Sequence, residues 1–267
     1  MVTRRAAVVA IAAVVAAVGL AVGAAVFYPI SYDDTNTTAD DHFTFEPGDE
    51  YRVTGEMEIN DERFIDYEAT VAADGERHTV MEGDTGMTET YRPDSDSDVY
   101  LLRVFTDDEA AERARERLED SSRRVLVDEE RNGEETRFFV VDKHARDADV
   151  DRQVSLFLNG LWAVGYERVE DGDTNVYEPE TGWYDSTSPY RVTDASGHVT
   201  VDADTYSVMA AAVDIEMVEA GSYAEYLQHR DESETLSVTL EVEPGADVDE
   251  PAWVEDIREQ RERNPSQ

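Results

Sequence analysis

The chain has 267 residues, with 63 acidic against 23 basic side chains, a formal net charge of −40 and no cysteine. Nucleic acid binding needs a basic surface for the phosphates, so this charge argues against nucleic acid as a partner. Without cysteine, neither a disulfide nor a lipid-modified cysteine at the N-terminus can form.

The basic residues have an unusual composition, because Lys143 is the only lysine and every other one is arginine. Acid excess with almost no lysine resembles the surface composition of proteins from extremely halophilic archaea. The resemblance implies adaptation to brine, in which the Debye length falls to about 3 Å and most self-repulsion is screened. We therefore do not take the acidity as evidence for a cationic partner.

The first predicted element is the apolar segment Ala6–Phe27, which contains no charged or polar side chain. Its length is near the ~20 residues that a helix needs to span the hydrocarbon core of a bilayer. Arg4 and Arg5 precede it, and the first acidic residue after it is Asp33. Basic flanks stay in the cytoplasm, so the chain after this segment is predicted to lie outside the cell.

This topology predicts a cytoplasmic stub over 1–5, a transmembrane helix over 6–28 and an extracellular C-terminal domain on the cell membrane. The alternative is a cleaved signal peptide, for which Gly23-Ala24-Ala25 offers a vague cleavage site. In both cases the domain is exported.

Residues 29–49 are polar and acidic, and we interpret them as a linker between membrane and domain. Asn36-Thr37-Thr38 is an N-glycosylation sequon, which makes Asn36 a candidate glycosylation site. A chance match in a threonine-rich linker is the alternative.

A β-rich exported domain is predicted over 50–245. The runs Tyr51–Ile59, Ile65–Val71 and Leu236–Val242 alternate apolar with mostly charged or polar residues, which is the pattern of strands with one wet face. Val99–Phe105 is apolar at successive positions, so both its faces are predicted to be buried. These strands predict a curved antiparallel sheet of about eight strands.

One helix is predicted over 107–120, because Thr106 and Glu109 form a capping box. Its narrow apolar stripe consists of Ala110, Ala111, Ala114 and Leu118. Such a stripe suits a helix that lies on the concave side of a sheet.

The second half is predicted to be mainly β. Val154–Leu158 and Leu161–Tyr166 are bulky runs separated by Asn159-Gly160, and we interpret both as strands. The run Val208–Met217 changes its phase of alternation, which predicts a β-bulge near Ala211–Ala212. The segment 246–267 is predicted to be a C-terminal helix and tail, starting at Pro251, with Trp253, Val254 and Ile257 on one side.

No motif identifies a catalytic, cofactor-binding or metal-binding residue. Asp94–Asp98 opens like a calcium loop, but Val99 and Phe105 occupy the positions that require glycine and glutamate. The five histidines are dispersed, and no nucleophile elbow or phosphate loop is present. An aromatic cluster either lines a binding cavity or packs in the core: Tyr177, Trp183, Tyr184 and Tyr190.

The order of elements, with the segment Gly197–Asp202, the long strand 206–218 and a late strand ending at Val242-Glu243-Pro244, resembles the exported LolA/LolB-like proteins of haloarchaea. The resemblance implies an incomplete antiparallel β-barrel with helices in its concave side. It also implies a role like that of the bacterial relatives, which carry lipids or lipoprotein acyl chains.

We therefore predict an α+β, mainly β fold: an N-terminal transmembrane helix, then a curved antiparallel half-barrel with one or two packing helices. The predicted function is that of a single-pass, membrane-anchored extracytoplasmic domain that is not an enzyme and that binds a lipid-like or apolar ligand or an envelope protein. The alternative is an extracytoplasmic hydrolase with an unrecognised acidic site.

Overall fold

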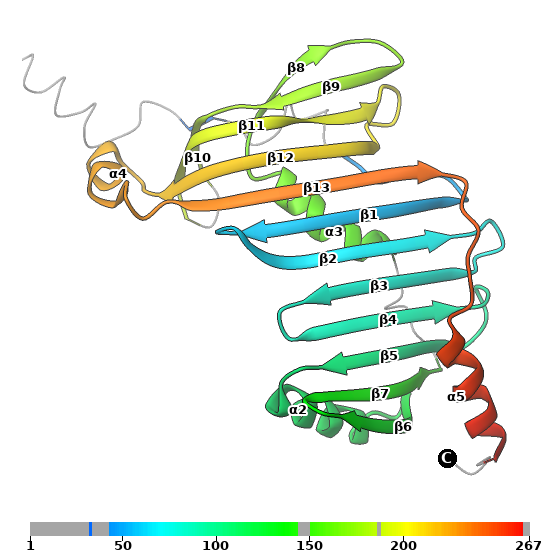
Figure 1. Ribbon diagram of the computed structural model, residues 1–267. Coiled ribbons are helices and arrows are strands. Elements are labelled where there is room, and N and C mark those ends of the chain that lie inside the picture. The colour runs from blue at the N-terminus through cyan, green and yellow to red at the C-terminus, as the bar shows by residue number, and fades with distance from the viewer. Residues whose placement is uncertain (1–31, 34–42, 144–149, 186–187, 264–267) are drawn as a thin grey trace, which may run out of the picture.

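The computed structural model describes residues 32–33, 43–143, 150–185 and 188–263. Within these ranges thirteen strands form one antiparallel sheet, and four helices accompany it (Figure 1). The strand order is β6-β7-β5-β4-β3-β2-β1-β13-β12-β11-β9-β8, and β10 pairs with β11 beside this path.

The strands are β1 (Tyr51–Ile59), β2 (Glu62–Val71), β3 (Arg77–Gly83), β4 (Gly86–Arg92), β5 (Val99–Phe105), β6 (Arg124–Asn132), β7 (Glu135–Asp142), β8 (Tyr166–Glu170), β9 (Thr174–Pro179), β10 (Gly182–Tyr184), β11 (Tyr190–Asp202), β12 (Val208–Glu219) and β13 (Glu234–Pro244). The helices are α2 (Asp108–Glu119), α3 (Val150–Leu161), α4 (Tyr223–His229) and α5 (Ala252–Arg263).

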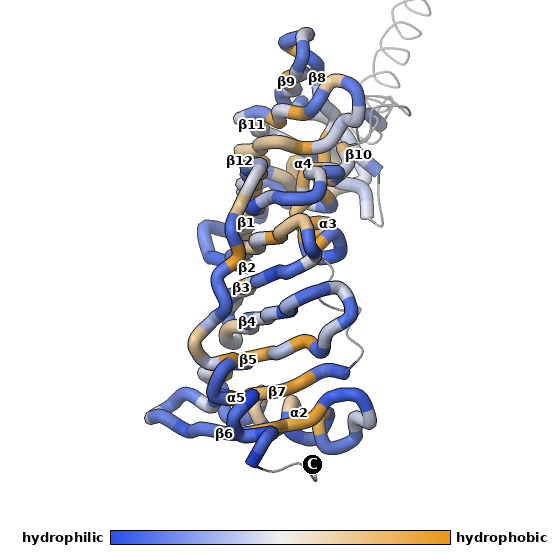
Figure 2. The backbone as a smooth tube through the Cα atoms, turned by 90° about the vertical axis from the view of Figure 1, so that its right-hand side faces the viewer, coloured by the Kyte–Doolittle hydropathy of each residue, from blue (hydrophilic) through white to orange (hydrophobic). Residues whose placement is uncertain are grey.

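The predicted fold class is wrong. A half-barrel has one concave side for its helices, whereas this sheet is open and carries helices on both faces: α2 and α3 on one, α5 on the other (Figures 1 and 2). In the part of the chain that the structure describes, no helix combines the length and the apolar character needed to cross a membrane. The predicted transmembrane helix, 6–28, lies outside the described residues.

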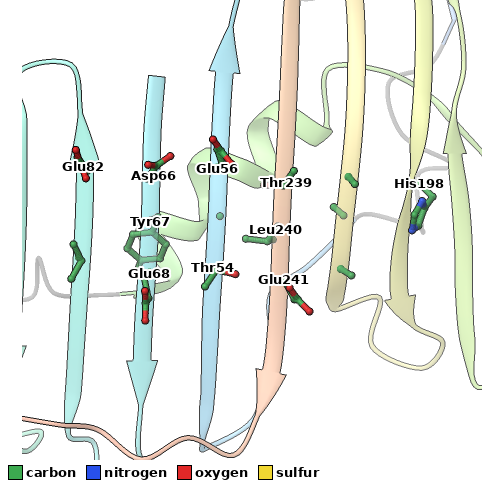
Figure 3. A pocket seen from close by; sticks show the side chains of 15 residues that line it. Thr54, Glu56, Asp66, Tyr67, Glu68, Glu82, His198, Thr239, Leu240 and Glu241 are labelled. Atoms are coloured by element: carbon green, nitrogen blue, oxygen red, sulfur yellow. The ribbon is translucent and has the colours of Figure 1, made fainter. Parts of the chain in front are cut away.

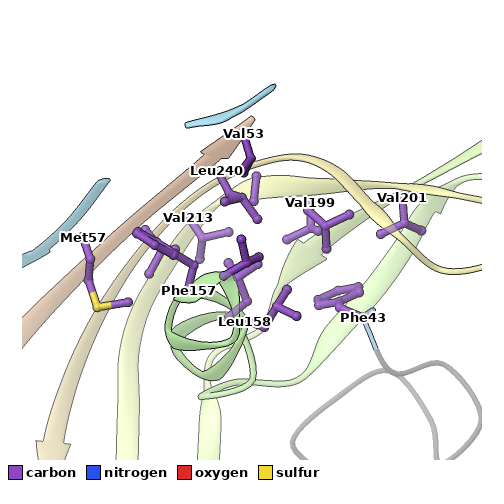
Figure 4. Packing of buried hydrophobic residues seen from close by; sticks show 14 of the residues in the cluster. Phe43, Val53, Met57, Phe157, Leu158, Val199, Val201, Val213 and Leu240 are labelled. Carbon is purple, nitrogen blue, oxygen red and sulfur yellow. The ribbon is translucent and has the colours of Figure 1, made fainter. Parts of the chain in front are cut away.

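The central strands bury one face under α3 (Figure 4). In β1 every second residue is buried (Tyr51, Val53, Gly55 and Met57), while Arg52, Thr54 and Glu56 between them are exposed or half-buried. Two glycines allow α3 to lie close to the sheet: Gly55 on β1 and Gly160 on α3. A Cβ on Gly55 would lie 2.8 Å from the ring of Phe157, and one on Gly160 would lie 2.9 Å from Val238.

The two strands predicted at Val154–Leu158 and Leu161–Tyr166 are wrong for most of their length, because α3 occupies 150–161. The buried residues of α3 recur with the spacing of a helix face: Val150, Val154, Phe157, Leu158 and Leu161. Two tyrosine hydroxyls donate to carbonyl groups at and just beyond its C-terminal end, Tyr166 to Leu161 and Tyr190 to Ala163. The helix is therefore held firmly in the middle of the core.

The strands β5 and β7 are covered on both faces, as the apolar run Val99–Phe105 predicts. On one face, Val99, Leu101 and Phe138 pack against Ala111, Ala114 and Leu118 of α2. On the other face, Tyr100 and Val141 pack against Val254 and Ile257 of α5.

Both helices of this region are confirmed near their predicted positions, with one change at a cap. The predicted helix over 107–120 is α2, but its N-cap is Asp107 rather than Thr106, and its side chain accepts from the backbone N–H of Ala110. The predicted C-terminal helix is α5.

Two local predictions need correction. The change of phase in β12 lies at Met209 rather than at Ala211–Ala212, because Val208 and Ala210 are paired with consecutive residues of β11. In the segment predicted to be a linker, Phe43 is buried in the core and Thr44 forms a parallel bridge with Ser207.

Candidate functional site

The central strands leave a hollow of about 620 Å³ on the face opposite α3 (Figure 3). It lies over β2, β1, β13 and β12, with Val80 and Glu82 of β3 at one side and His198 of β11 at the other. We call this surface the open face, because the described helices pack elsewhere: α3 lies behind these strands and α5 lies over β5 and β7.

Short side chains produce the hollow. Antiparallel register places Thr54 beside Glu241 and Glu241 beside Ala210, and in the next row it places Glu56 beside Thr239 and Thr239 beside Ala212. The floor therefore presents the methyl groups of alanine, threonine and valine. Longer side chains stand around this floor: Glu56, Asp66, Glu68, Glu82, Glu241 and His198.

Five carboxylates make the rim strongly acidic, and two arginines partly neutralise it. Arg52 contacts Glu68 at 2.9 Å, and Arg63 contacts Asp66 and, at 3.7 Å, Glu82. The hydrogen bond to Asp66 and the charges of Asp66 and Glu82 raise the pKa of the exposed Arg63. Both arginines therefore neutralise carboxylates on the β2 and β3 side of the rim. Glu56 and Glu241 extend the acidic rim over β1 and β13.

A second hollow, of about 730 Å³, lies where β12 ends and α4 begins. Its lining includes Glu219, Glu225, Glu234 and His229. His229 lies 3.0 Å from Glu232, and Glu225 accepts the backbone N–H of Gly221 at 2.7 Å. Four of its nine lining residues are glutamates, against five acidic residues among the fifteen that line the open face, so we place the candidate site on the less acidic open face.

The histidines stay dispersed. His198 is exposed at the edge of the open face, His229 is on α4, and His78 lies 2.8 Å from Glu89. His42 and His144 lie outside the described residues. Groups of three or more His, Cys, Asp or Glu side chains placed to hold a metal ion do not occur within the described ranges.

The sequence candidates outside the hollow have local roles. In the loop Asp94–Asp98, Asp94 accepts from the backbone N–H of Asp96 at 2.8 Å and from the hydroxyl of Ser97 at 2.6 Å. These bonds, the one from Ser97 first, lower the pKa of Asp94. The candidate glycosylation site, Asn36, lies outside the described residues. The predictions of no catalytic, cofactor-binding or metal-binding residue remain predictions.

The predicted aromatic cluster is split by the structure. Tyr177 and Tyr184 are buried in the main core, and Tyr190 packs against it, so these three tyrosines contribute to core packing. Trp183 instead packs against α4, with its ring centroid 5.0 Å from that of Tyr223.

A cluster around Arg191 was missed by sequence reasoning. The guanidinium carbon of Arg191 lies 5.3 Å from the ring centroids of Trp183 and Tyr223 and 4.6 Å from that of Tyr226. Such cation–π contacts hold α4 against β10 and β11. In the sequence, only the i, i+3 spacing of Tyr223 and Tyr226 indicates that these two rings lie on one side of a helix. Nothing local indicates that Arg191 and Trp183 lie beside them.

The hollow itself was also missed, because it depends on which strands are neighbours. The alternation of Thr54 with Glu56 and of Thr239 with Glu241 was visible in the sequence. That β13 lies between β1 and β12 is a long-range pairing, and no local pattern specifies it.

Comparisons of this chain with protein-family models, with curated proteins and with solved structures find no match. The resemblance to LolA/LolB-like proteins therefore stays a prediction.

Proposed function

We propose that this chain is an extracytoplasmic binding protein, not an enzyme, and that its open face binds another protein of the cell envelope. The observation that carries the proposal is the hollow of about 620 Å³ on the side of the central strands that none of the described helices covers. Its methyl-lined floor offers apolar contact in a surface that is otherwise charged, so it suits a docking segment of a partner.

A partner protein fits this hollow better than a carried lipid does. Lipid carriage needs an apolar cavity that encloses most of the ligand. On the apolar side of the central strands, α3 fills the space over Gly55, and Gly160 brings α3 into direct contact with β13. The open face has a carboxylate rim, which an acyl chain would have to desolvate.

The hydrolase alternative has weaker support. A general acid at neutral pH needs a carboxyl group whose pKa is raised, usually by burial in an apolar pocket. Glu56, Glu68, Glu82 and Glu241 are exposed, and Asp66 is only half-buried. The rim therefore resembles a solvated edge that excludes mismatched partners by charge more than it resembles a catalytic pair.

The side chains that line the hollow indicate which partner segment would fit it. Small apolar side chains would pack on Ala210, Ala212 and Thr54, whose methyl groups leave space above the sheet. Hydroxyl, amide or basic groups at the edge of that segment would satisfy the carboxylates of Glu56 and Glu241. At molar salt, long-range attraction is screened, so contacts within a few ångströms determine the affinity.

The absence of cysteine allows a single-site test in the full-length protein. Ala212→Cys, in the hollow, and Leu156→Cys, on the exposed side of α3, would each carry a photoactivatable cross-linker in native membranes at molar KCl. We expect the label at 212, and not the label at 156, to give one protein adduct that mass spectrometry identifies.

The identified protein is then purified and its affinity is measured. Ala212→Arg should weaken binding at least about tenfold, which is about 1.4 kcal/mol, because the arginine fills the hollow. Leu156→Arg should leave the affinity unchanged. Identical adducts from both labels, or equal affinity for both arginine variants, would overturn the proposal.

A further inference from the structure

One end of the sheet presents aromatic and apolar side chains at its surface. Tyr32 is 41% exposed and Leu227 is 55% exposed. Leu227 follows Tyr223 by four residues on α4, so the two are neighbours on the helix surface. We call this region the α4 end: Tyr32, Trp183, Arg191 and α4.

The first described residues of the chain, Tyr32 and Asp33, lie at this same end. The carboxylate of Asp33 accepts the backbone N–H of Trp183 at 3.0 Å, and the hydroxyl of Tyr32 lies 3.5 Å from the carbonyl of Gly221, which precedes α4. Phe27, the last residue of the apolar segment, is five residues before Tyr32. Five extended residues reach at most about 18 Å, so the end of that segment cannot lie far from α4.

We propose that the α4 end is the surface by which the domain rests against a lipid membrane. The inference rests on the prediction that Ala6–Phe27 associates with lipid, and it is independent of what the open face binds. A membrane that holds Phe27 lies within reach of the α4 end, and the opposite ends of β11 and β12 are a full strand length away (Figure 1).

The side chains of the α4 end have the chemistry of a membrane–water interface. Tyrosine is enriched at that level, because its ring is apolar and its hydroxyl still reaches water. Trp183 is itself buried and packs against the rings of Tyr223 and Tyr226. Leu227 adds an exposed aliphatic side chain that can enter the headgroup region. Arg191 keeps its charge on the rings of Trp183, Tyr223 and Tyr226, so its burial against lipid would not leave an isolated cation.

The acidic side chains nearby do not prevent this contact at high salt. Glu232 lies 3.0 Å from His229, Asp231 lies 3.8 Å from Arg230, and Glu225 accepts from Gly221. The remaining negative charge repels an anionic membrane over about 3 Å at molar salt. The test therefore uses zwitterionic lipid and molar KCl.

Two single-cysteine variants of the full chain test the orientation. Leu227→Cys places a fluorophore on α4, and Met209→Cys places it at the opposite end of β12, on a residue that is 43% exposed. Each labelled protein is reconstituted into phosphatidylcholine vesicles, and quenching by lipids that carry a nitroxide on the headgroup is measured. Flotation reports whether the chain is bound to the vesicles.

We expect the chain to float with the vesicles and the label at 227 to be quenched at least about twofold more than the label at 209. Equal quenching of the two labels would overturn the orientation. Quenching of neither label in a chain that floats, or a chain that does not float, would overturn the proposal as well. Because the cross-linking at Ala212 reads a different surface, failure here leaves the proposed function standing.

Discussion

The central strands and the strands at the β6 end of the sheet differ in how many of their faces are buried. In β1 and β13 one face is buried under α3 and the other is open to water. In β5 and β7 both faces are buried, one under α2 and one under α5. The difference follows from composition, since β1 alternates Val53 and Met57 with Thr54 and Glu56, whereas β5 is apolar at nearly every position.

This comparison shows why the open face lies over the central strands. At the β6 end, the face that corresponds to the open face is occupied by Val254 and Ile257 of α5. In the centre, short side chains lie at the same level, and none of the described helices packs on them. A helix therefore covers the sheet face where the strand residues are apolar, and the face stays open where charged and short polar residues alternate with them.

The largest expected effect is the loss of the ring that α3 inserts against β1. Phe157→Ala should lower the free energy of unfolding by about 3–5 kcal/mol, because it leaves a cavity over Gly55 that the helix cannot close. Denaturant unfolding in molar KCl measures the change. Leu156→Ala, one residue away and 43% exposed, is the matched control and should change stability by less than about 0.5 kcal/mol. Equal losses would contradict the placement of α3.

The next effect separates the two regions. Ile257→Ala should cost about 2–5 kcal/mol, because Ile257 is 1% exposed between α5 and the sheet. Hydrogen exchange should accelerate in β5 and β7 and stay unchanged in β1 and β13, where α5 makes no part of the core. Asp256→Ala, on the exposed side of α5, should leave both regions unchanged. Uniform acceleration across the sheet would show that the regions unfold as one unit.

A smaller, pH-dependent effect concerns Glu89, on the same face of the sheet as α5. Burial raises the pKa of Glu89, but the hydrogen bond from His78, the hydrogen bond from Trp253 and the charge of His78 together outweigh it, so the folded-state pKa lies below the usual value. Such a group stabilises the fold above its unfolded pKa, and this contribution is lost as pH falls through the folded pKa.

Glu89→Gln should therefore cost about 1–3 kcal/mol near neutral pH and progressively less below about pH 4. Unfolding curves over that pH range measure the difference. The exposed Glu116→Gln on α2 is the control and should show no such trend. A cost that grows as the pH falls would contradict the assigned direction.

The smallest effects compare two neighbouring alanines of β12. Ala211 is 6% exposed under α3, and Ala212 faces the hollow. Ala211→Val should cost about 1–3 kcal/mol through overpacking, whereas Ala212→Val should stay within about 0.5 kcal/mol. Thermal unfolding of both variants at one salt concentration tests the pair. A larger loss for Ala212→Val than for Ala211→Val would contradict the assignment of the two faces of β12.

Local patterns predicted the elements whose burial is local. Alternation identified β1, β2 and β13. The capping signal and the narrow stripe identified α2. In these cases a single short stretch of sequence contains both the buried residues and the residues that mark a boundary of the element.

The helix α3 was missed because its burial depends on distant strands. Val154–Leu158 is bulky and includes valine and phenylalanine, which also favour strands. Its helical spacing becomes visible only when Val150 and Leu161 are counted with Val154, Phe157 and Leu158. The open sheet with helices on both faces was missed for a related reason, because α5 reaches β5 across more than 140 residues of chain.

The most direct test of the account is the accessibility of four consecutive thiols in β12. The chain has no cysteine, so Ala210→Cys, Ala211→Cys, Ala212→Cys and Val213→Cys each carry one reactive group. We predict that maleimide labels position 212, which is exposed, and position 210, which is half-buried, in the folded protein at molar KCl, because both alternate with the buried positions of β12. Positions 211 and 213, buried under α3, should react only after unfolding. Rapid labelling at all four positions, or protection at 212, would contradict a central sheet with one covered face and one open face.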